Sequence, residues 1–243
     1  MGLPRHLAFI MDGNGRWAAN RGHNRLFGHI RGAKVARSII EECSRLGIQN
    51  LTLFAFSTEN WFRPQDEVTF LMHLLFRQLK REREKLMSNN IRFHSIGEVS
   101  KLPKFVAEEV FKTIEMTAKN TGMNLTFALS YGGRQEIALM AQEIARQVQS
   151  HQIKPEEIDE ATIARLMPSS FLPDPDLIVR TSGESRISNF FLWQAAYSEI
   201  FFEKKPWPEF TIADLHSILQ QYQTRERRFG RTGEQVKEHG RLS

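Results

Sequence analysis

Short apolar runs alternate along this chain with longer segments in which apolar positions recur every three or four residues. The short runs predict strands at residues 6–11, 51–56, 91–96, 124–130, 177–180 and 199–202. The run LTLFAF at 51–56 is apolar at nearly every position, as in a strand covered on both faces of a parallel sheet. The alternation predicts a single-domain α/β fold, with a mostly parallel central sheet flanked by helices.

Helical periodicity predicts the elements between these strands. In the first helix the residues of one face recur through 30–46, with Gly47 at the C-cap and His29 at the start, where its backbone N–H is open to an anion. Further helices are expected at about 66–87, from Pro103, from Arg134, from Pro155 in a first turn, and after Thr211 as N-cap.

The segment EVTFLMHLLFRQL, within the helix expected at 66–87, has apolar side chains on more than one stripe. A surface helix needs only one apolar face. The pattern leaves two interpretations open: a deeply buried core helix, or a helix that lines an apolar cavity. Beyond Arg77 the sequence RQLKREREK is strongly charged, so this end is expected to reach solvent.

Composition narrows the class of protein. The 243 residues are 41% apolar, which suits one globular domain spanning 1–243. The net charge of +5 favours anionic partners, such as phosphates, nucleic acid or an acidic membrane surface. The single cysteine, Cys43, is expected in the core, and its isolation excludes a disulfide framework and fits a cytoplasmic location. No run approaches the roughly 18 apolar residues of a membrane span, so any membrane contact is expected to be peripheral.

The stretch MDGNGR follows the first strand, where open parallel sheets bind ligands. Gly13 and Gly15 let backbone N–H groups approach a phosphate, and Arg16 and Arg25 add bidentate contacts. Asp12 would repel a phosphate unless a divalent cation lies between them, and magnesium is held by one or two carboxylates plus phosphate oxygens. The sequence therefore indicates a magnesium-assisted phosphate or diphosphate site. The alternative is a hairpin turn, although no alternating return strand follows.

Three familiar phosphate chemistries do not fit. There is no G-x-x-x-x-G-K-[ST] loop, and GNGRWA only begins like a dinucleotide-binding fingerprint. A D-x-D-G phosphatase needs a nucleophilic acid where Ile10 stands.

Two more polar clusters follow predicted strands. FSTENWFRP carries Ser57, Thr58, Asn60 and Arg63, and its alternative interpretation is the loop that starts the next helix. DLIVRTSGESRISNF carries two arginines and two serines suited to another anion, and here the alternative is an ordinary loop. Glu199 is either a solvated acid or, opposite Asp12, a second metal ligand. Taken together, the clusters predict an amphiphilic diphosphate substrate, with its tail in an apolar channel beside the helix at 66–87.

Several long stretches, in order, resemble signature motifs of the cis-prenyltransferases: HLAFIMDGNGRWA, FGHIRGAK, LTLFAFSTENWFRP, SYGGRQEI, RTSGESRISNFFLWQAAYSE and RERRFG. The resemblance spans about residues 6–230. It implies a parallel α/β fold with a hydrophobic tunnel, a homodimer, and magnesium-dependent cis addition of isopentenyl diphosphate to farnesyl diphosphate. The implied product is a medium-length, undecaprenyl-type diphosphate, the precursor of a lipid carrier for cell-wall synthesis.

The resemblance also implies roles for matching residues. Asp12 matches the essential aspartate and a magnesium ligand, Glu199 a magnesium ligand, and Asn60 a residue near the proton-loss step. The allylic diphosphate loop is matched by Gly13, Asn14, Gly15, Arg16, Trp17, Arg25 and His29. The segment over the site is matched by Ser57, Thr58, Glu59, Trp61 and Arg63. The isopentenyl diphosphate pocket is matched by Arg180, Arg186, Ile187 and Ser188. In the basic tail at 225–243, Arg228 and Gly230 match an R-x-G motif that reaches the partner subunit.

One departure from the family pattern is Ser185, where many relatives have histidine, and it bears on magnesium affinity. Three alternatives remain: a short-chain cis-prenyl synthase, a non-catalytic accessory subunit of the same fold, and a nucleic-acid binder. No nucleic-acid-binding motif accompanies the positive charge, so no nucleic-acid partner is expected.

Overall fold

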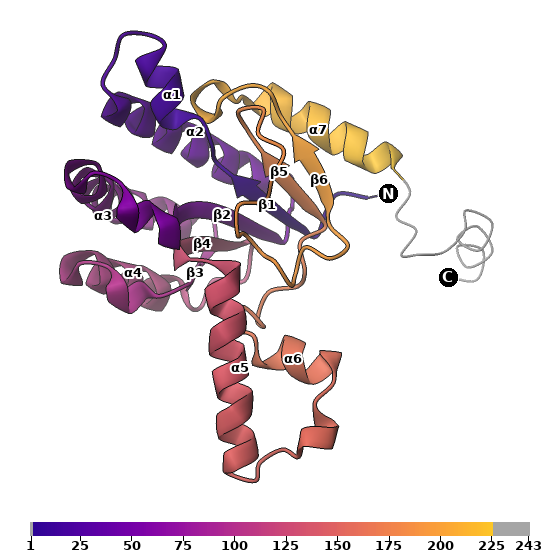
Figure 1. The fold of residues 1–243 in the computed structure, drawn as a ribbon. Coiled ribbons are helices and arrows are strands. Elements are labelled where there is room, and N and C mark those ends of the chain that lie inside the picture. The colour runs from indigo at the N-terminus through magenta and orange to yellow at the C-terminus, as the bar shows by residue number, and fades with distance from the viewer. Residues whose placement is uncertain (1, 226–243) are drawn as a thin grey trace.

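The computed structural model describes residues 2–225, and its centre is a six-stranded, all-parallel sheet (Figure 1). The strands are β1 (His6–Ile10), β2 (Asn50–Ser57), β3 (Arg92–Ile96), β4 (Asn124–Tyr131), β5 (Leu177–Arg180) and β6 (Glu199–Phe202). They lie in the order β3-β4-β2-β1-β5-β6. Every strand predicted from the sequence is confirmed, with ends that differ by at most one residue, and so is the parallel α/β fold.

Seven α-helices connect or follow these strands in the described part of the chain. They are α1 (Asn14–Ala19), α2 (Arg25–Arg45), α3 (Gln65–Ser88), α4 (Lys104–Thr117), α5 (Gly133–Gln149), α6 (Glu160–Leu166) and α7 (Ile212–Thr224). Short 3-10 helices are η1 (Thr58–Phe62), η2 (Val99–Lys101), η3 (Pro155–Glu157) and η4 (Trp207–Glu209). Thr211 is the N-cap of α7, as predicted, and accepts a hydrogen bond from Asp214 N.

Three helix predictions were wrong. The glycine loop after β1 turns at once into α1, a helix that the sequence pattern does not predict. Helix α2 begins at Arg25 after the cap Asn24, so His29 lies in the second turn and its backbone N–H is not open to an anion. Pro155 opens only η3, because the cap that starts α6 is Asp159, whose side chain accepts from Thr162 N at 2.7 Å.

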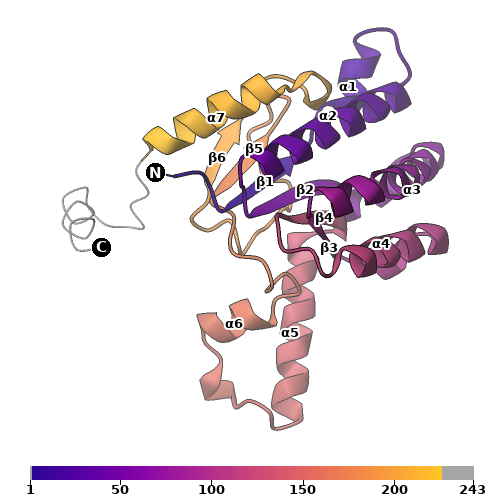
Figure 2. The same ribbon diagram turned by 180° about the vertical axis from the view of Figure 1, so that it is seen from behind.

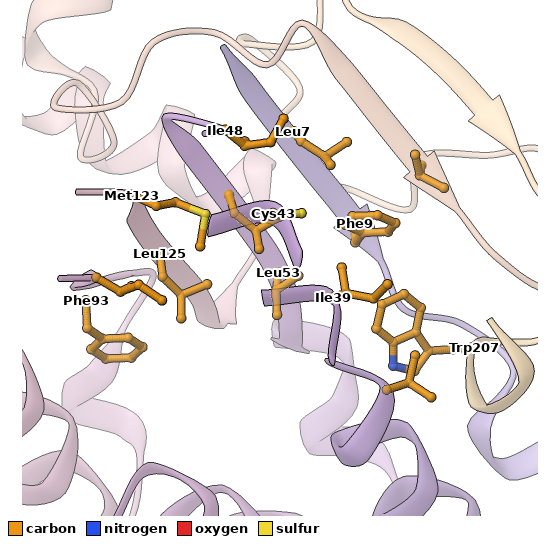
Figure 3. Packing of buried hydrophobic residues seen from close by; sticks show 14 of the residues in the cluster. Leu7, Phe9, Ile39, Cys43, Ile48, Leu53, Phe93, Met123, Leu125 and Trp207 are labelled. Carbon is orange, nitrogen blue, oxygen red and sulfur yellow. The ribbon is translucent and has the colours of Figure 1, made fainter. Parts of the chain in front are cut away.

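The sheet has two differently covered faces, since successive side chains of a strand point to opposite sides. The helical face carries Leu7, Phe9 and Leu53 and packs against α2, α3, α4 and α7 (Figure 2). Cys43 is fully buried in this cluster, as predicted (Figure 3). The aromatic face carries Ala8 and Ile10 and is covered by aromatic rings from the segment after β5 and from the end of β4.

Two predictions concern the C-terminal tail and contact with a membrane. Apart from Arg225, the basic tail expected at 225–243 lies outside the described residues, and so do Arg228 and Gly230. Within residues 2–225, none of the helices combines the length and apolar character needed to cross a bilayer.

Candidate active site

The loop after β1 begins the site, and its geometry depends on glycine. Gly13 has φ 101°, a left-handed conformation that L side chains rarely adopt. A Cβ atom there would lie 2.7 Å from Ser182 Oγ and 2.9 Å from Pro206 Cβ. Gly13 therefore lets the chain turn tightly from β1 into α1, against the loop that follows β5. Gly15, inside α1, lets the guanidinium group of Arg25 lie against the backbone, since a Cβ atom there would be 2.7 Å from Arg25 Cζ.

Asp12 stands at the carboxyl end of β1 between two arginines. Its Oδ2 accepts a hydrogen bond from Arg180 Nη2 at 2.9 Å and lies 3.2 Å from Arg16 Nη2. Its Oδ1 accepts from Gly13 N at 2.6 Å. Partial burial acts to raise the pKa of Asp12, but the hydrogen bond from Arg180 and the two positive charges outweigh it, so the pKa lies below its usual value. Asp12 is therefore ionised at neutral pH.

Arg180, the last residue of β5, is held inside the site and is only 3% exposed. Its Nη1 donates to the backbone oxygen of Arg186 and to Ser188 Oγ, at 2.5 and 2.6 Å. Of the residues expected to bind isopentenyl diphosphate, Arg180 contacts Asp12 from the neighbouring strand, and Arg186 and Ser188 contact Arg180. Ile187 lies between them in the same loop.

Glu184, a residue without a predicted role, links the segment after β1 to the loop after β5. It accepts hydrogen bonds from Arg16 Nη1 at 2.6 Å and from Arg186 Nη1 at 2.5 Å. The hydrogen bond from Arg16 is the main reason that the pKa of Glu184 lies below its usual value. Its signal in the sequence was an acid between Arg180 and Arg186, in a loop otherwise suited to anions.

Glu67, in the first turn of α3, contacts three more of the residues predicted to lie in the site. Arg63 Nη1 lies 3.0 Å, His29 Nε2 3.3 Å and Arg25 Nε 3.4 Å from its carboxylate oxygens. Burial raises the pKa of Glu67, but Arg63, Arg25 and His29 together lower it further. Burial first, and then the charge of Arg63, lowers the pKa of His29, so its ring is neutral at neutral pH.

The segment after β2 folds into η1 and is tied to the loop after β5. Asn60 Oδ1 accepts from the backbone N–H of Ser57 at 3.2 Å, and Trp61 Nε1 donates to Ser130 Oγ at 2.9 Å. Asn189 Nδ2 donates to Glu59 Oε1 at 2.8 Å. Thr58 lies against Gly132, where a Cβ atom would be 2.7 Å from its hydroxyl oxygen. All the predicted residues of this segment thus lie at the same edge of the sheet.

The charges of this edge do not balance. Five guanidinium groups, from Arg16, Arg25, Arg63, Arg180 and Arg186, meet three carboxylates, from Asp12, Glu67 and Glu184. Each carboxylate faces two guanidinium groups. Glu59, which pairs with Asn189 at the same edge, is a fourth carboxylate and leaves a surplus of one positive charge. The arginines still suit a phosphate, since arginine binds phosphate oxygens in a bidentate fashion.

An apolar cavity of about 180 Å³ begins beside this edge and lies between α2, α3 and the sheet. Asn14 and His29 border its near end, and small residues of α2, including Gly32, Ala33 and Ala36, line its wall. The sequence left two interpretations of α3, a buried core helix or a helix that lines a cavity. In the structure α3 lines the cavity with Leu71, Leu74 and Leu75.

Asn14 borders the near end of the cavity, whereas Trp17 does not line it. Trp17 Nε1 donates to Glu209 at 2.9 Å, and its ring stacks on Phe27 at 6.0 Å. The side-chain oxygen of Asn14 is buried and has no hydrogen-bond partner within the described residues.

The structure separates Glu199 from Asp12. Glu199 starts β6 and is in register with Leu177, whereas Arg180, which contacts Asp12, ends β5. The offset is three residues, about 10 Å along the strand, and β6 is also two strands away from β1. Glu199 pairs instead with Arg225. The expectation that Glu199 lies opposite Asp12 is wrong within one chain, because strand register puts them at opposite ends of the sheet.

The donor set still fits one kind of magnesium site. Among residues 2–225 no cluster of three or more His, Cys, Asp or Glu side chains could hold a metal ion. Asp12, a partly exposed carboxylate surrounded by anion-binding arginines, fits a magnesium ion that takes its other ligands from phosphate oxygens and water.

Backbone strain marks the site in a way that the sequence did not reveal. Four non-glycine residues at this edge have positive φ: Ser130, Ser182, Ser188 and Asn189. Such strain gathers at functional sites, where the surrounding structure holds it. Thr181 was also missed; its hydroxyl accepts from Asp12 N at 3.0 Å and donates to Asp12 O at 2.8 Å, which fixes the main chain at Asp12.

Comparisons with known proteins agree with one another. The family model described as putative undecaprenyl diphosphate synthase matches residues 10–230. An isoprenyl transferase of Geobacter sulfurreducens is 53% identical over 96% of this chain and 95% of its own length. A ditrans,polycis-undecaprenyl-diphosphate synthase of Vibrio vulnificus is 46% identical over 97% of this chain and 94% of its own. Among solved structures, lavandulyl diphosphate synthase from Lavandula x intermedia, in complex with dimethylallyl diphosphate, has a TM-score of 0.92 and 38% identity, covering 94% of this chain and 98% of that one.

Proposed function

The chain belongs to the undecaprenyl diphosphate synthase family of prenyltransferases, and we propose that it adds isopentenyl diphosphate repeatedly to farnesyl diphosphate. The proposed product is a medium-length, undecaprenyl-type polyprenyl diphosphate. One observation supports this most: an arginine-rich edge with surplus positive charge opens directly onto an apolar cavity. A diphosphate with a hydrocarbon tail matches both halves of that arrangement.

We assign the two diphosphates to two groups of residues. The loop of Gly13, Asn14, Gly15 and Arg16, together with Arg25 and His29, would bind the allylic diphosphate and aim its tail into the cavity that Asn14 and His29 border. Arg180, Arg186 and Ser188 would bind isopentenyl diphosphate. In the structure, arginines of both groups pair with Glu67 or Glu184. Binding of a diphosphate would therefore replace these carboxylate partners with phosphate oxygens.

The reaction breaks the allylic C–O bond and leaves a carbocation and a free diphosphate. The double bond of isopentenyl diphosphate supplies the electron pair for the new C–C bond, which leaves a positive charge on its other carbon. A proton is then lost from the carbon next to that cation, and the electrons of the broken C–H bond form the new double bond. Arginine side chains stabilise the negative charge that grows on the leaving group. Asp12 would hold magnesium, which, when bound, adds Lewis-acid stabilisation of that charge. Glu199 of the same chain is too far away to share this ion.

Proton loss needs an acceptor other than Asn60. A neutral amide is a poor base, and the Asn60 oxygen already accepts from Ser57 N. We assign Asn60 to positioning and the acceptor role to the released diphosphate or an ordered water. A homodimer, a cytoplasmic location, peripheral contact with the membrane through the lipid product and a role in cell-wall synthesis belong to the same proposal.

The test is incubation of the purified chain with farnesyl diphosphate, labelled isopentenyl diphosphate and magnesium, followed by chromatographic sizing of the lipid. We expect label in a long lipid. Asp12→Ala should lower the rate at least about 100-fold, the loss typical when one group that stabilises transition-state charge is removed. Asp159→Ala, which removes an acid at the cap of α6 far from the site, is the matched control and should keep the rate.

Other outcomes separate the alternatives. Extension by only one or two units would identify a short-chain synthase. Absence of incorporation at every magnesium concentration, with activation of a second subunit, would identify an accessory protein and overturn the proposal.

A further inference from the structure

Trp207, the first residue of η4, lies between the apolar cavity and the chain at Asp12. Its ring borders the cavity, is only 1% exposed and packs against Phe9 and Phe210, with ring centroids at 5.4 and 5.5 Å (Figure 3). Its backbone N–H donates to the carbonyl oxygen of Asp12 at 2.9 Å. One residue therefore contacts both the space for a hydrocarbon tail and the main chain of the acid at the arginine-rich edge.

A second hydrogen bond fixes the ring of Trp207 on the wall of the cavity. Its Nε1 donates to the backbone oxygen of Gly32 on α2 at 2.9 Å. This close approach depends on glycine, because a Cβ atom at position 32 would lie 2.9 Å from Trp207 Cδ1. The indole ring is thus bonded to α2 at one atom, while the backbone of the same residue is bonded to Asp12.

The main chain of Asp12 is held from two sides. On one side the hydroxyl of Thr181 accepts from Asp12 N at 3.0 Å and donates to Asp12 O at 2.8 Å. On the other side stands Trp207, and Met11, the residue before Asp12, also lines the cavity. A hydrocarbon in the cavity would therefore touch two residues, Met11 and Trp207, that are joined to Asp12 by the chain or by a hydrogen bond.

The cavity is too small to take a tail without a response of its walls. Its volume of about 180 Å³ is little larger than that of a cavity of about 150 Å³ that holds benzene. A tail of fifteen carbons fits only if the wall residues shift. Because the ring of Trp207 is part of that wall and is bonded to α2, such a shift reaches the N–H group that binds Asp12.

We propose that Trp207 is a positioning residue through which the hydrocarbon tail fixes the place of Asp12, an inference that rests on the proposed function. The tail binds away from the bond that breaks, so its contacts raise the rate only if they improve the geometry at that bond. A tail packed on the indole ring holds the N–H of Trp207, and with it the main chain of Asp12, in one position beside Arg16 and Arg180. Binding energy of the tail then appears as rate.

The first experiment uses farnesol, which has the hydrocarbon tail and no diphosphate. Nuclear magnetic resonance spectra of the isotope-labelled chain follow the amide groups of Asp12 and Trp207 as farnesol is added without magnesium. In wild type we expect both resonances to shift with the same dependence on farnesol. Trp207→Phe keeps an aromatic ring but lacks the N–H that binds Gly32, so the resonance of Asp12 should shift less. Tyr222→Phe, which removes the polar group of a buried ring outside the cavity wall, is the matched control.

The second experiment compares single-turnover rates of the first addition with dimethylallyl and farnesyl diphosphate. In Trp207→Phe the farnesyl rate should fall about fivefold, which corresponds to the ~1 kcal/mol of one hydrogen bond. The dimethylallyl rate should stay near wild type, because that short tail leaves most of the cavity empty, and KM should stay near wild type for both substrates. A merely structural role of the ring would lower both rates alike.

The outcomes separate this inference from the proposed function. Farnesol that shifts the resonance of Trp207 and leaves that of Asp12 in place would overturn the role of Trp207, and so would the absence of any shift. Unchanged rates, or an equal fall with both substrates, would also overturn it while leaving prenyl transfer intact. A chain that shows the farnesol response and transfers no prenyl group would support the link and overturn the proposed function. The wild-type titration tests the inference even if Trp207→Phe does not fold.

Discussion

The two faces of the central sheet are filled in opposite ways. On the aromatic face, Phe190 stacks on Phe191 at 4.3 Å and on Phe54 at 4.6 Å, and Tyr131 meets both Phe190 and Phe191 edge-on. On the helical face, small side chains leave a cavity of about 180 Å³ between α2, α3 and β2. Protein interiors are normally close-packed, so the empty space is the feature that requires explanation.

The difference between the faces indicates that the aromatic face mainly stabilises the fold, whereas the helical face provides space for a ligand. The aromatic face holds the loop after β5, which carries Arg186 and Ser188, against the sheet. The helical face leaves space next to the arginine-rich edge, at the cost of the packing contacts that larger residues would make. Changes on the aromatic face should therefore affect folding first, and changes at the cavity should affect the product first.

The largest expected effect is the loss of stability when an aromatic ring is removed from the aromatic face. Phe190 is fully buried, so Phe190→Ala should lower the free energy of unfolding by about 3–5 kcal/mol. Phe127→Ala is the matched change on the helical face, where the ring is partly buried and already borders the cavity. Urea unfolding of both variants should show a clearly smaller loss for Phe127→Ala. Equal losses would contradict the difference between the faces.

The next effect is a pH dependence located on the aromatic face. His6 is fully buried beside Phe191, and its Nδ1 donates to Pro173 O at 2.6 Å. Burial, only partly offset by that hydrogen bond and by Asp176, lowers the pKa of His6 to about 4 from its ordinary 6.5. Between these values the unfolded chain binds the proton and the folded chain does not, so stability falls as pH falls.

From pH 7 to pH 5 this loss should be about 2 kcal/mol. The measurement is urea unfolding at both pH values for wild type and His6→Gln. The variant should be less stable at pH 7 but should lose about 2 kcal/mol less than wild type on acidification. An unchanged pH dependence in His6→Gln would show that other groups cause the loss.

The smallest expected effect on stability comes from filling the cavity. Ala36→Leu adds a side chain where space exists, so the free energy of unfolding should change by less than about 1 kcal/mol, while the product becomes shorter. Ala8→Leu makes the same change on the aromatic face, where Ala8 is fully buried, and should cost about 1–3 kcal/mol. Both variants are compared by unfolding and by product sizing. An equal cost at both positions, or an unchanged product in Ala36→Leu, would argue against the cavity as the site of the tail.

Much of this fold could be predicted because the strands are short, apolar and well separated. LTLFAF, for example, is β2 with one residue added at each end. The start of α2 was predicted at His29, four residues too far along the chain. Arg25, Leu26 and Phe27 give little sign of helix when the cap Asn24 is overlooked. Helix α1 was missed because Gly13 and Gly15 signal a loop, whereas only Gly13 has positive φ.

The arginines of the site could be predicted from the sequence, whereas the glutamates that pair with them could not. Arginines after strands signal anion binding, so Arg16, Arg63, Arg180 and Arg186 were found. Glu67 and Glu184 were assigned no role, because pairing across loops depends on three-dimensional approach. Glu199 was misplaced for the same reason, since strand register is set by the whole sheet and not by neighbouring residues. The choice between a buried α3 and a cavity-lining α3 likewise depended on the small residues of α2 that face it.

The most direct test of the central claim is a crystal structure of the chain with magnesium and an unreactive thio analogue of farnesyl diphosphate. The account predicts the diphosphate on Arg16 and Arg25 beside Asp12, with the hydrocarbon between α2 and α3. A tail that lay outside the helical face, or a diphosphate bound away from the loop after β1, would contradict it.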